Sequence, residues 1–312
     1  MEQIQYSIII PHKNIPELLQ RCLFSIPKRT DTEVIVIDDN SSSDNVSLMK
    51  QMEKKIDLNV SFIYDKSGKG AGRARNIGLD AAKGEKILFA DSDDFFNYCV
   101  DDILSQYTND DSDLLFFKAN SVDTDFYTNS GRAEGLNYFI DSFLSRNDRG
   151  DYLLRYAHGA PHCKIIKRSL IEQNSVRFPE VSVNEDTRFS YLLGYYAKTI
   201  KADKRALYCI TMRSGSMTYT MNERKVLDQV RVMAERDRFF LDHNIPLCRG
   251  FHIETLVKLR KEENDSVYNQ CIDIIMSYGF SRKEIEQRVN SLLFNENKHE
   301  FFQRIKKILR RK

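Results

Sequence analysis

No stretch of this sequence approaches the roughly 18 to 20 uninterrupted apolar residues that a membrane-spanning helix needs. Its first residues, Met1–Gln3, lack the basic and apolar regions of a secretory signal, so we expect a cytosolic protein. The six cysteines include no Cys-x-x-Cys pair, which argues against a structural zinc site and a disulfide framework. A net charge of +2 gives no overall signal for nucleic-acid binding, so we expect no nucleic-acid partner.

What is present is an ordinary soluble composition of 41% hydrophobic and 29% charged residues over a length of 312, enough for one large domain and a smaller one. Over the first ninety residues, extended apolar runs alternate with helical patterns. The predicted strands are Tyr6–Pro11, Glu33–Asp38, Asn59–Tyr64 and Glu85–Ala90, and the predicted helices are Pro16–Ile26, Asp44–Ile56 and Arg73–Ala82. This alternation indicates an α/β fold with a mostly parallel, Rossmann-like sheet flanked by helices, and such sheets bind ligands beyond the carboxyl ends of their strands.

Polar side chains follow the ends of all four predicted strands. The first strand leads into Pro11–Asn14 and the second into Asp38–Asp44, where Asp39 could accept hydrogen bonds from a uracil-like base or from ribose hydroxyls. A turn and helix cap over Asn40–Asp44 is an alternative interpretation, and it is compatible with the first.

The third strand leads into a glycine-rich loop, Lys66–Asn76, which contains three glycines and four basic side chains and opens a helix. Exposed N–H groups, the positive end of a helix and basic side chains such as Lys66 and Arg73 would together bind a pyrophosphate. The loop lacks the G-x-x-x-x-G-K-[ST] order of a P-loop and does not follow the first strand, so neither a P-loop nor a dinucleotide fingerprint is indicated.

The fourth strand ends in the acid tetrad Asp91–Asp94, which places three carboxylates within four residues. Carboxylates about 5 Å apart would repel by roughly 3 kcal/mol per pair at an effective dielectric near 20, so a divalent cation is the simplest counter-charge. Ligation by oxygen atoms favours Mg²⁺ or Mn²⁺ over zinc. A solvated turn in which Asp91 or Asp94 caps a helix is the alternative.

The four strand ends carry the motifs P-x-x-N, D-D-x-S, G-x-x-x-A-R-N-x-G and D-x-D-D in that order. With them, residues 6–97 resemble the nucleotide-sugar-dependent glycosyltransferases of the GT-A fold, specifically the inverting family 2 of bacterial surface-polysaccharide synthesis. The resemblance implies a Mn²⁺ or Mg²⁺ cofactor. By this resemblance, Pro11 and Asp39 line the base pocket, and Arg73 and Asn76 lie near the sugar-phosphate. Asp91 and Asp93 form the D-x-D pair of the metal site, in which Asp93 holds the metal and Asp91 faces donor sugar or ribose.

The resemblance resumes at Pro161–Ile171, Arg177–Glu180 and Asn184–Phe189, which look like the acceptor half of the same enzymes. There an aspartate that follows a glutamate at a helix start is the catalytic base, which makes Asp186 the base here and Glu185 the alternative. Inverting transfer requires such a carboxylate in any case, to deprotonate the acceptor hydroxyl while cations stabilise the leaving phosphate. Without the resemblance, Asp186 could simply be an acid favoured at a helix N-terminus.

Three departures from the family pattern limit what the resemblance implies. Lys13 stands where many relatives have tyrosine, and there is no tryptophan for a sugar to stack on, so His162 or nearby aromatic side chains are candidates to replace it. His158 and His162, at helical spacing, are interpreted as packing or surface residues rather than metal ligands. The Gln-x-x-Arg-Trp signature of processive synthases is absent, which favours a single-addition transferase.

We expect residues 1–215 to form the catalytic domain, with a nucleotide-sugar half over 1–97 and an acceptor half over 98–215, and residues 216–312 to be helical. Within that last region, Ser281–Glu284 is a capping-box pattern. Lys298–Lys312 holds seven Lys and Arg side chains against one Glu, with apolar residues on one helical side. This segment fits either an interfacial helix on an anionic inner leaflet or a helix packed on the domain.

Three classes of function follow. The leading one is an inverting transferase that moves a sugar from a nucleotide diphosphate sugar, most simply a uridine one, to a hydroxyl of a saccharide or lipid-linked saccharide. The second is a sugar nucleotidyltransferase, although its basic glycine-rich loop normally follows the first strand. The third is a catalytically silent relative that acts as a partner subunit, against which the intact Asp93 and Asp186 argue.

Overall fold

The computed structural model describes residues 3–212, 222–247 and 251–294. The chain divides into two compact units. The first comprises Met1–Val181 and Glu185–Tyr219, and the second comprises Ser182–Asn184 and Thr220–Lys312. The domain boundary expected at residue 215 lies outside the described residues.

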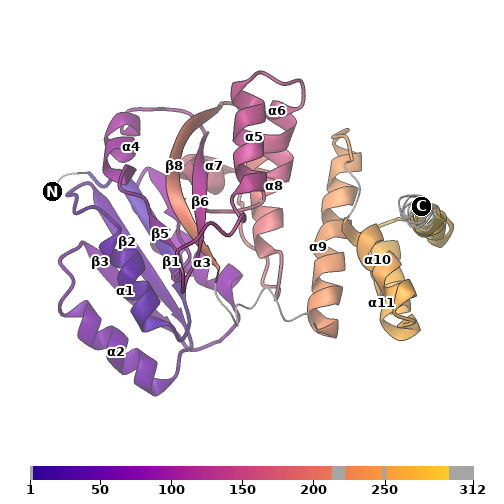
Figure 1. Cartoon of the computed structure of the whole chain (residues 1–312), viewed down its shortest axis with the longest axis horizontal. Coiled ribbons are helices and arrows are strands. Elements are labelled where there is room, and N and C mark those ends of the chain that lie inside the picture. Colours follow the sequence, from indigo (N-terminus) through magenta and orange to yellow (C-terminus); the bar gives the residue numbers. More distant parts are fainter. Residues whose placement is uncertain (1–2, 213–221, 248–250, 295–312) are drawn as a thin grey trace, which may run out of the picture. The chain divides into compact units, whose positions relative to one another are not determined.

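The first unit is built around an eight-stranded sheet with the strand order β3-β2-β1-β4-β7-β6-β8-β5 (Figure 1). The strands are β1 (Tyr6–His12), β2 (Thr32–Asp39), β3 (Val60–Asp65), β4 (Lys86–Phe89), β5 (Phe95–Phe96), β6 (Leu114–Asp123), β7 (Lys164–Lys167) and β8 (Ile200–Met212). β1 pairs in parallel with β2 and β4, and β2 pairs in parallel with β3. The four predicted strands therefore form one parallel block, and their carboxyl ends meet at one edge. β7 runs antiparallel to β4 and β6, β6 is parallel to β8, and β5 is antiparallel to β8.

Helices cover both faces of the sheet, because successive side chains of each strand point into two different cores (Figure 1). Ile8 and Ile10 of β1 face one core, and Ile9 faces the other. The first core is closed by α1 (Pro16–Phe24), α2 (Ser43–Glu53) and α4 (Val100–Tyr107). The second is closed by α3 (Ala71–Ala81), α5 (Glu134–Leu144), α7 (Arg168–Gln173) and α8 (Glu185–Tyr196). The short α6 (Gly150–Tyr152) and the π-helical turn η1 (Leu153–Ala157) follow α5. The predicted α/β class is confirmed.

Local sequence explains how two of these helices begin and where one of them packs. α1 begins at Pro16, as predicted, because proline suits the first helical position. α3 follows Gly70, whose φ of 94° lies in the left-handed region that favours glycine. Gly78 allows α3 to lie against β1, because a Cβ atom at that position would be 2.3 Å from Ile9 Cγ2.

The second unit is helical, with α9 (Glu223–Asp242), α10 (Phe251–Lys261), α11 (Asp265–Ser277) and a helix over 282–294. Its core includes Val230, Leu256 and Cys271. The predicted capping box is confirmed, because the amide of Glu284 donates to Ser281 Oγ at 3.2 Å and the amide of Ser281 donates to Glu284 Oε2 at 3.2 Å. The basic segment Lys298–Lys312 lies outside the described residues.

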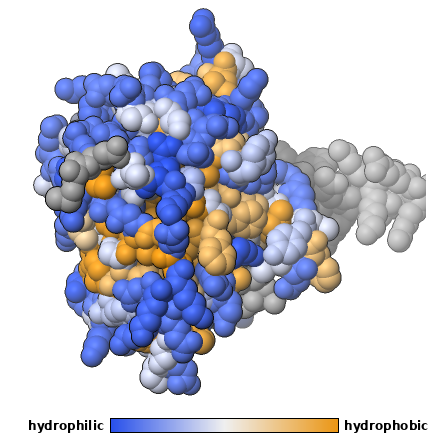
Figure 2. All heavy atoms as spheres, turned by 90° about the vertical axis from the view of Figure 1, so that its left-hand side faces the viewer, coloured by the Kyte–Doolittle hydropathy of each residue, from blue (hydrophilic) through white to orange (hydrophobic). Residues whose placement is uncertain are grey.

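None of the helices in the described ranges has both the length and the apolar character needed to cross a membrane. Figure 2 shows one face of the molecule, with hydrophobic side chains gathered across its middle and hydrophilic ones around them. Apolar atoms make up more than half of the surface of ordinary soluble proteins, so such exposure alone does not indicate a partner.

Candidate active site

The polar residues that follow the parallel strands lie along one edge of the sheet. The strand register places His12 beside Asp38, and Asp39 beside Asp65. His12 Nδ1 is 3.0 Å from Asp38 Oδ1, and both side chains are buried. Burial raises the pKa of Asp38, but hydrogen bonds from His12 and Ser41 outweigh that effect and hold this pKa below its usual range. Asp38 is therefore an ionised structural support next to Asp39.

Asp39, a predicted base-pocket residue, is joined to the glycine-rich loop. Its two carboxylate oxygens lie 3.1 and 3.2 Å from the amide nitrogen of Gly70, which donates to them. Lys13 Nζ lies 3.2 Å from Asp39 Oδ2, so the departure from the family pattern at position 13 is directly connected to this carboxylate. Pro11, the other predicted base-pocket residue, is buried at the end of β1.

Of the basic residues predicted to bind pyrophosphate, Lys66 lies in the loop and Arg73 lies in the first turn of α3, where it is partly exposed. Lys66 is exposed. Arg73 Nε lies 2.9 Å from Asp65 Oδ2, and its NH1 lies 3.3 Å from Glu180 Oε1. Ion pairs of this partly exposed kind contribute little to stability, so an incoming anion can compete for Arg73.

The acid tetrad is fixed by β8. The amide of Asp91 donates to the Tyr208 hydroxyl at 2.7 Å, and the amide of Thr211 donates to Asp94 Oδ1 at 2.7 Å. The Thr211 hydroxyl donates to the carbonyl oxygen of Asp93 at 2.7 Å. Asp94 is buried, whereas Asp91 and Asp93 are half-buried. A fully solvated turn, the alternative interpretation of the tetrad, does not describe this arrangement.

A buried arginine, Arg75, joins the tetrad to the second acid motif. Its NH2 group lies 2.7 Å from Asp91 Oδ1, and its NH1 group lies 2.8 Å from Glu185 Oε1. The neighbouring Asn76, predicted to lie near the sugar-phosphate, exchanges two hydrogen bonds with the backbone of Phe178, at 2.8 and 2.9 Å. The A-R-N sequence of α3 thus connects the parallel block of the sheet to the segment that leads into α8.

Sequence reasoning singled out Arg73 and did not assign a role to Arg75. The buried residues of α3 include Gly72, Arg75, Gly78 and Leu79, which recur three and four positions apart, so Arg75 lies on the face of the helix that packs against the protein. Residues two positions apart in a helix point to nearly opposite sides, so Arg73 faces solvent because Arg75 faces the protein.

His162 lies beside the tetrad and not on the surface. Its Nδ1 is 3.7 Å from Asp91 Oδ2, and its ring stacks on Tyr208 with a centroid distance of 5.0 Å. Burial lowers the pKa of His162 to about 4, so the ring is neutral at pH 7. One ligand atom from each of Asp91, Asp94 and His162 lies within 4.8 Å of the others, a grouping that could hold a metal ion and that does not include Asp93.

Asp186 lies in the first turn of α8, next to Glu185. Burial, followed by the negative charge of Glu185, raises the pKa of Asp186 to about 6. One helical turn further on, Ser190 Oγ lies 3.2 Å from Nζ of the buried Lys164, which also donates to the carbonyl oxygen of His158 at 2.8 Å. The His158 ring packs against Phe116 in the core, in agreement with its interpretation as a packing residue.

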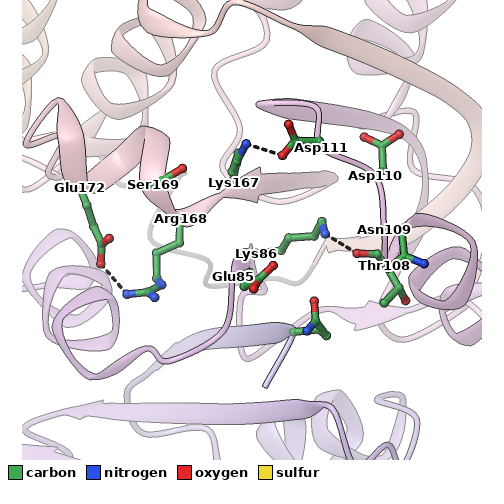
Figure 3. A pocket seen from close by; sticks show the side chains of 11 residues that line it. Glu85, Lys86, Thr108, Asn109, Asp110, Asp111, Lys167, Arg168, Ser169 and Glu172 are labelled. Atoms are coloured by element: carbon green, nitrogen blue, oxygen red, sulfur yellow. Dashed lines mark hydrogen bonds and ion pairs between the residues drawn. The ribbon is translucent and has the colours of Figure 1, made fainter. Parts of the chain in front are cut away.

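A cavity of about 520 Å³ lies elsewhere, near the beginnings of β4 and α7 (Figure 3). It is lined by charged residues that are largely paired with one another, such as Lys167 with Asp111 and Arg168 with Glu172. None of the predicted site residues lines it, so we place the candidate site at the acid cluster and not in this cavity.

Comparison with known proteins gives a family match and several relatives. Residues 7–174, more than half of the chain, match the family described as glycosyl transferase family 2. The poly(ribitol-phosphate) beta-N-acetylglucosaminyltransferase TarS of Staphylococcus aureus is 29% identical over 94% of this chain and 52% of its own length. The poly(ribitol-phosphate) beta-glucosyltransferase of Bacillus spizizenii is 30% identical over 66% of this chain and 31% of its own length. The chain thus spans about half or less of the length of these curated relatives.

Solved structures share the fold. The structure of S. aureus TarS 1–349 in complex with UDP-GlcNAc has a TM-score of 0.63 and 23% identity, and the match covers 95% of this chain and 92% of that one. The mannosyltransferase PcManGT from Pyrobaculum calidifontis, in complex with GDP-Man and Mn²⁺, has a TM-score of 0.56 and 14% identity, with 96% of this chain and 81% of that one covered. At these identities the likeness establishes the fold alone.

Proposed function

Because this chain belongs to glycosyl transferase family 2 and has the GT-A fold, we propose that it is an inverting glycosyltransferase that moves a sugar from a nucleotide diphosphate sugar to a hydroxyl group of an acceptor. The observation that carries the proposal is the pair of contacts made by Arg75. This one buried side chain contacts Asp91 of the strand-end tetrad and Glu185 of the second acid motif. A donor site and a base held in one cluster are what a direct displacement requires.

Asp186 is the general base in this proposal. A carboxylate with a pKa of about 6 is ionised at neutral pH, yet it binds a proton more strongly than an ordinary aspartate. It takes the proton of the acceptor hydroxyl while that oxygen forms a bond to the anomeric carbon of the donor, and the bond from that carbon to the diphosphate oxygen breaks on the opposite face. Glu185 is the weaker candidate, because its carboxylate is engaged with Arg75.

The donor lies along the edge of the parallel block. Asp39 accepts hydrogen bonds from the base or ribose, with Pro11 as the apolar wall, and Asp91 faces the ribose or donor sugar. Lys66 and Arg73 contact the diphosphate, for which Arg73 gives up its exposed ion pairs. Asn76 acts by fixing α3 to Phe178. A uridine nucleotide is favoured because the related TarS structures are described with UDP-GlcNAc and with UDP.

A divalent cation fits this site. Asp91, Asp94 and His162 offer two carboxylate oxygens and one neutral ring nitrogen, and both buried ring nitrogens of His162 lack a hydrogen-bond partner. Such a mixed oxygen and nitrogen set suits Mn²⁺ better than Mg²⁺, which prefers oxygen and water. When bound, the cation would neutralise charge on the leaving diphosphate. Asp93, the ligand predicted from the D-x-D pattern, is the alternative to Asp94.

We also propose that the acceptor is a saccharide, free or lipid-linked, of a bacterial surface polysaccharide. Relatives are named for poly(ribitol-phosphate) glycosylation, so that polymer is the second acceptor to be tested. A sugar nucleotidyltransferase is disfavoured, since the basic glycine-rich loop follows β3 and not β1. Contact of Lys298–Lys312 with an anionic membrane is a further part of this proposal. Failure of the full chain to sediment with anionic liposomes at low salt would contradict it.

The test is release of nucleoside diphosphate from UDP-GlcNAc, UDP-glucose and GDP-mannose, with Mn²⁺, Mg²⁺ or a chelator. The acceptors are methyl glycosides, their disaccharides and poly(ribitol phosphate). Donor synthesis that depends on pyrophosphate would favour the nucleotidyltransferase, and tight nucleotide binding without turnover would favour a silent subunit.

Variants separate the proposed roles. Asp93→Ala and Asp94→Ala identify which carboxylate supports cation-dependent donor binding. Asp186→Asn is expected to bind donor nearly normally and to lose transfer. Equal loss of donor binding in the Asp186 variant and in the cation-site variant would contradict the assignment of roles.

A further inference from the structure

A segment connects β6 to α5 (Figure 1). Both of its ends contact Thr211, the β8 residue that is hydrogen-bonded to the acid tetrad. At its start, Val122 is the register partner of Thr211 in the β6–β8 pair. At its finish, Arg132 NH1 donates to the carbonyl oxygen of Thr211 at 3.1 Å. Thr211 itself donates to Asp94 and to the backbone of Asp93. Both ends of the segment are therefore fixed beside the proposed catalytic centre.

The tip of this segment is a tight turn built on Asp123. The Asp123 carboxylate accepts hydrogen bonds from the amides of Asp125 and Phe126, at 2.9 and 3.0 Å. The amide of Tyr127 donates to the Asp123 carbonyl at 2.9 Å, and the amide of Asp123 donates to the Thr128 carbonyl at 2.8 Å. Tyr127 has a φ of 54°, in the left-handed region that non-glycine residues rarely adopt. These hydrogen bonds fix the backbone of the turn.

Two aromatic rings stand exposed at this tip. The exposed fractions are 79% for Phe126 and 60% for Tyr127. Phe126 is four residues from Val122, so at no more than about 3.6 Å per residue the tip lies within roughly 15 Å of the β6–β8 strand end. The segment belongs to the β6–β8 part of the sheet, on the other side of β4 from β2, the strand that carries Asp39. It therefore borders the acceptor side of the cluster and not the donor side.

We propose that Phe126 and Tyr127 form a stacking platform for a sugar ring of the acceptor, a few units from the hydroxyl that attacks. This inference rests on the proposed function. The apolar C–H face of a sugar packs on the negative face of an aromatic ring, and a rigid ring loses little side-chain entropy in doing so. The chain has no tryptophan to serve this purpose, and the His162 ring already stacks on Tyr208.

The test compares Phe126→Ala, Tyr127→Ala and the double variant with two controls. Tyr127→Phe keeps the ring. Tyr98→Ala removes a ring that is 98% exposed outside this segment, beside Asn97, whose amide donates to the carbonyl oxygen of Leu207 in β8. With oligosaccharides several units long as acceptors, each alanine variant is expected to raise the acceptor KM about three- to tenfold, the loss of one aromatic contact, whereas the KM for methyl glycosides, which carry only the attacking unit, stays unchanged. In the alanine variants of Phe126 and Tyr127, the kcat, the donor KM and the rate of donor hydrolysis without acceptor stay unchanged. The two control variants keep the acceptor KM of the wild type.

Three results would overturn the platform while leaving the proposed function intact. The first is an unchanged acceptor KM in the double variant. The second is a rise in KM for poly(ribitol phosphate), which has no sugar ring in its backbone, that equals the rise for the oligosaccharide acceptors. The third is that the wild-type protein transfers sugar to that polymer and to no saccharide. If the wild-type protein releases no nucleoside diphosphate from any donor, the proposed function itself fails and the platform fails with it. Both rings are exposed, so an unchanged melting temperature will show that the variants fold.

Discussion

Replacing Asp186 with asparagine should abolish transfer and at the same time stabilise the folded protein. The asparagine side chain has nearly the same shape but cannot accept a proton as a base, so transfer is lost. The wild-type carboxylate is half-buried beside Glu185, and burial followed by that neighbouring charge raises its pKa to about 6 from its ordinary value of 3.8. The ionised form therefore destabilises the fold at neutral pH, and the neutral amide removes this penalty.

The size and the pH window follow from the shift. About two pKa units at 1.36 kcal/mol each give an upper limit of about 3 kcal/mol, and partial solvent exposure reduces it to about 1–3 kcal/mol. Because the folded protein binds this proton more strongly than the unfolded chain, wild-type stability falls as the pH rises from about 4 to about 6. The advantage of the Asp186→Asn variant is full above pH 6 and vanishes below about pH 4. At neutral pH it corresponds to a melting temperature about 2–10 °C higher.

The assay is thermal unfolding of both proteins between pH 4 and pH 8, followed by calorimetry or circular dichroism. Asp44→Asn is a matched control, because Asp44 is an exposed acid in the first turn of α2. Its melting temperature should differ little from that of the wild type at every pH. A lower melting temperature for Asp186→Asn at pH 7, or a difference that does not change with pH, would refute the reasoning.

Four further predictions concern the site and the fold. The kcat of the wild type should fall as the pH drops through about 6, because protonated Asp186 cannot act as a base; a flat profile down to pH 4.5 would contradict this. Arg75→Met should lower the free energy of unfolding in urea by about 3–5 kcal/mol, because it leaves two carboxylates without their buried counter-charge. Gly78→Ala should lower it by about 1–3 kcal/mol through overlap with Ile9, and an unchanged urea midpoint would argue against that close packing. His162→Ala should weaken Mn²⁺ binding in calorimetric titrations more than Mg²⁺ binding, whereas equal effects on the two ions would exclude a nitrogen ligand.

The parallel half of the fold was predictable because each of its strands is a short apolar run followed by a helix with recognisable start and stop signals. α1 begins at Pro16 for a local reason that the sequence displays. The rest of the sheet carries no such signal. β7 is only four residues long and has lysines at both ends, Lys164 and Lys167, and its place between β4 and β6 is set by long-range pairing. Local pattern reasoning does not reach such pairings.

The same limit applies to the candidate site. Asp39, Asp91 and Asp186 could be singled out, since each stands at a strand end or helix start where a carboxylate has a chemical use. Whether Arg73 or Arg75 points inward depends on which face of α3 packs against the core, and only the fold defines that face. The environment of His162 likewise depends on tertiary contacts with Asp91 and Tyr208 that its spacing from other histidines does not reveal.

The position of Arg75 explains why carboxylates of one cluster differ in their protonation. Burial raises the pKa of Asp91, but the guanidinium 2.7 Å away holds it below its usual range. Asp94 is bonded to the Thr211 amide, and burial together with the charges of Asp91 and Asp93 raises its pKa well above normal. Burial also raises the pKa of Asp186, the residue next to the one that Arg75 contacts. The guanidinium of Arg75 thus keeps the carboxylate of Asp91 ionised while that of Asp186 remains able to receive a proton, which is the separation of roles that the proposed transfer requires.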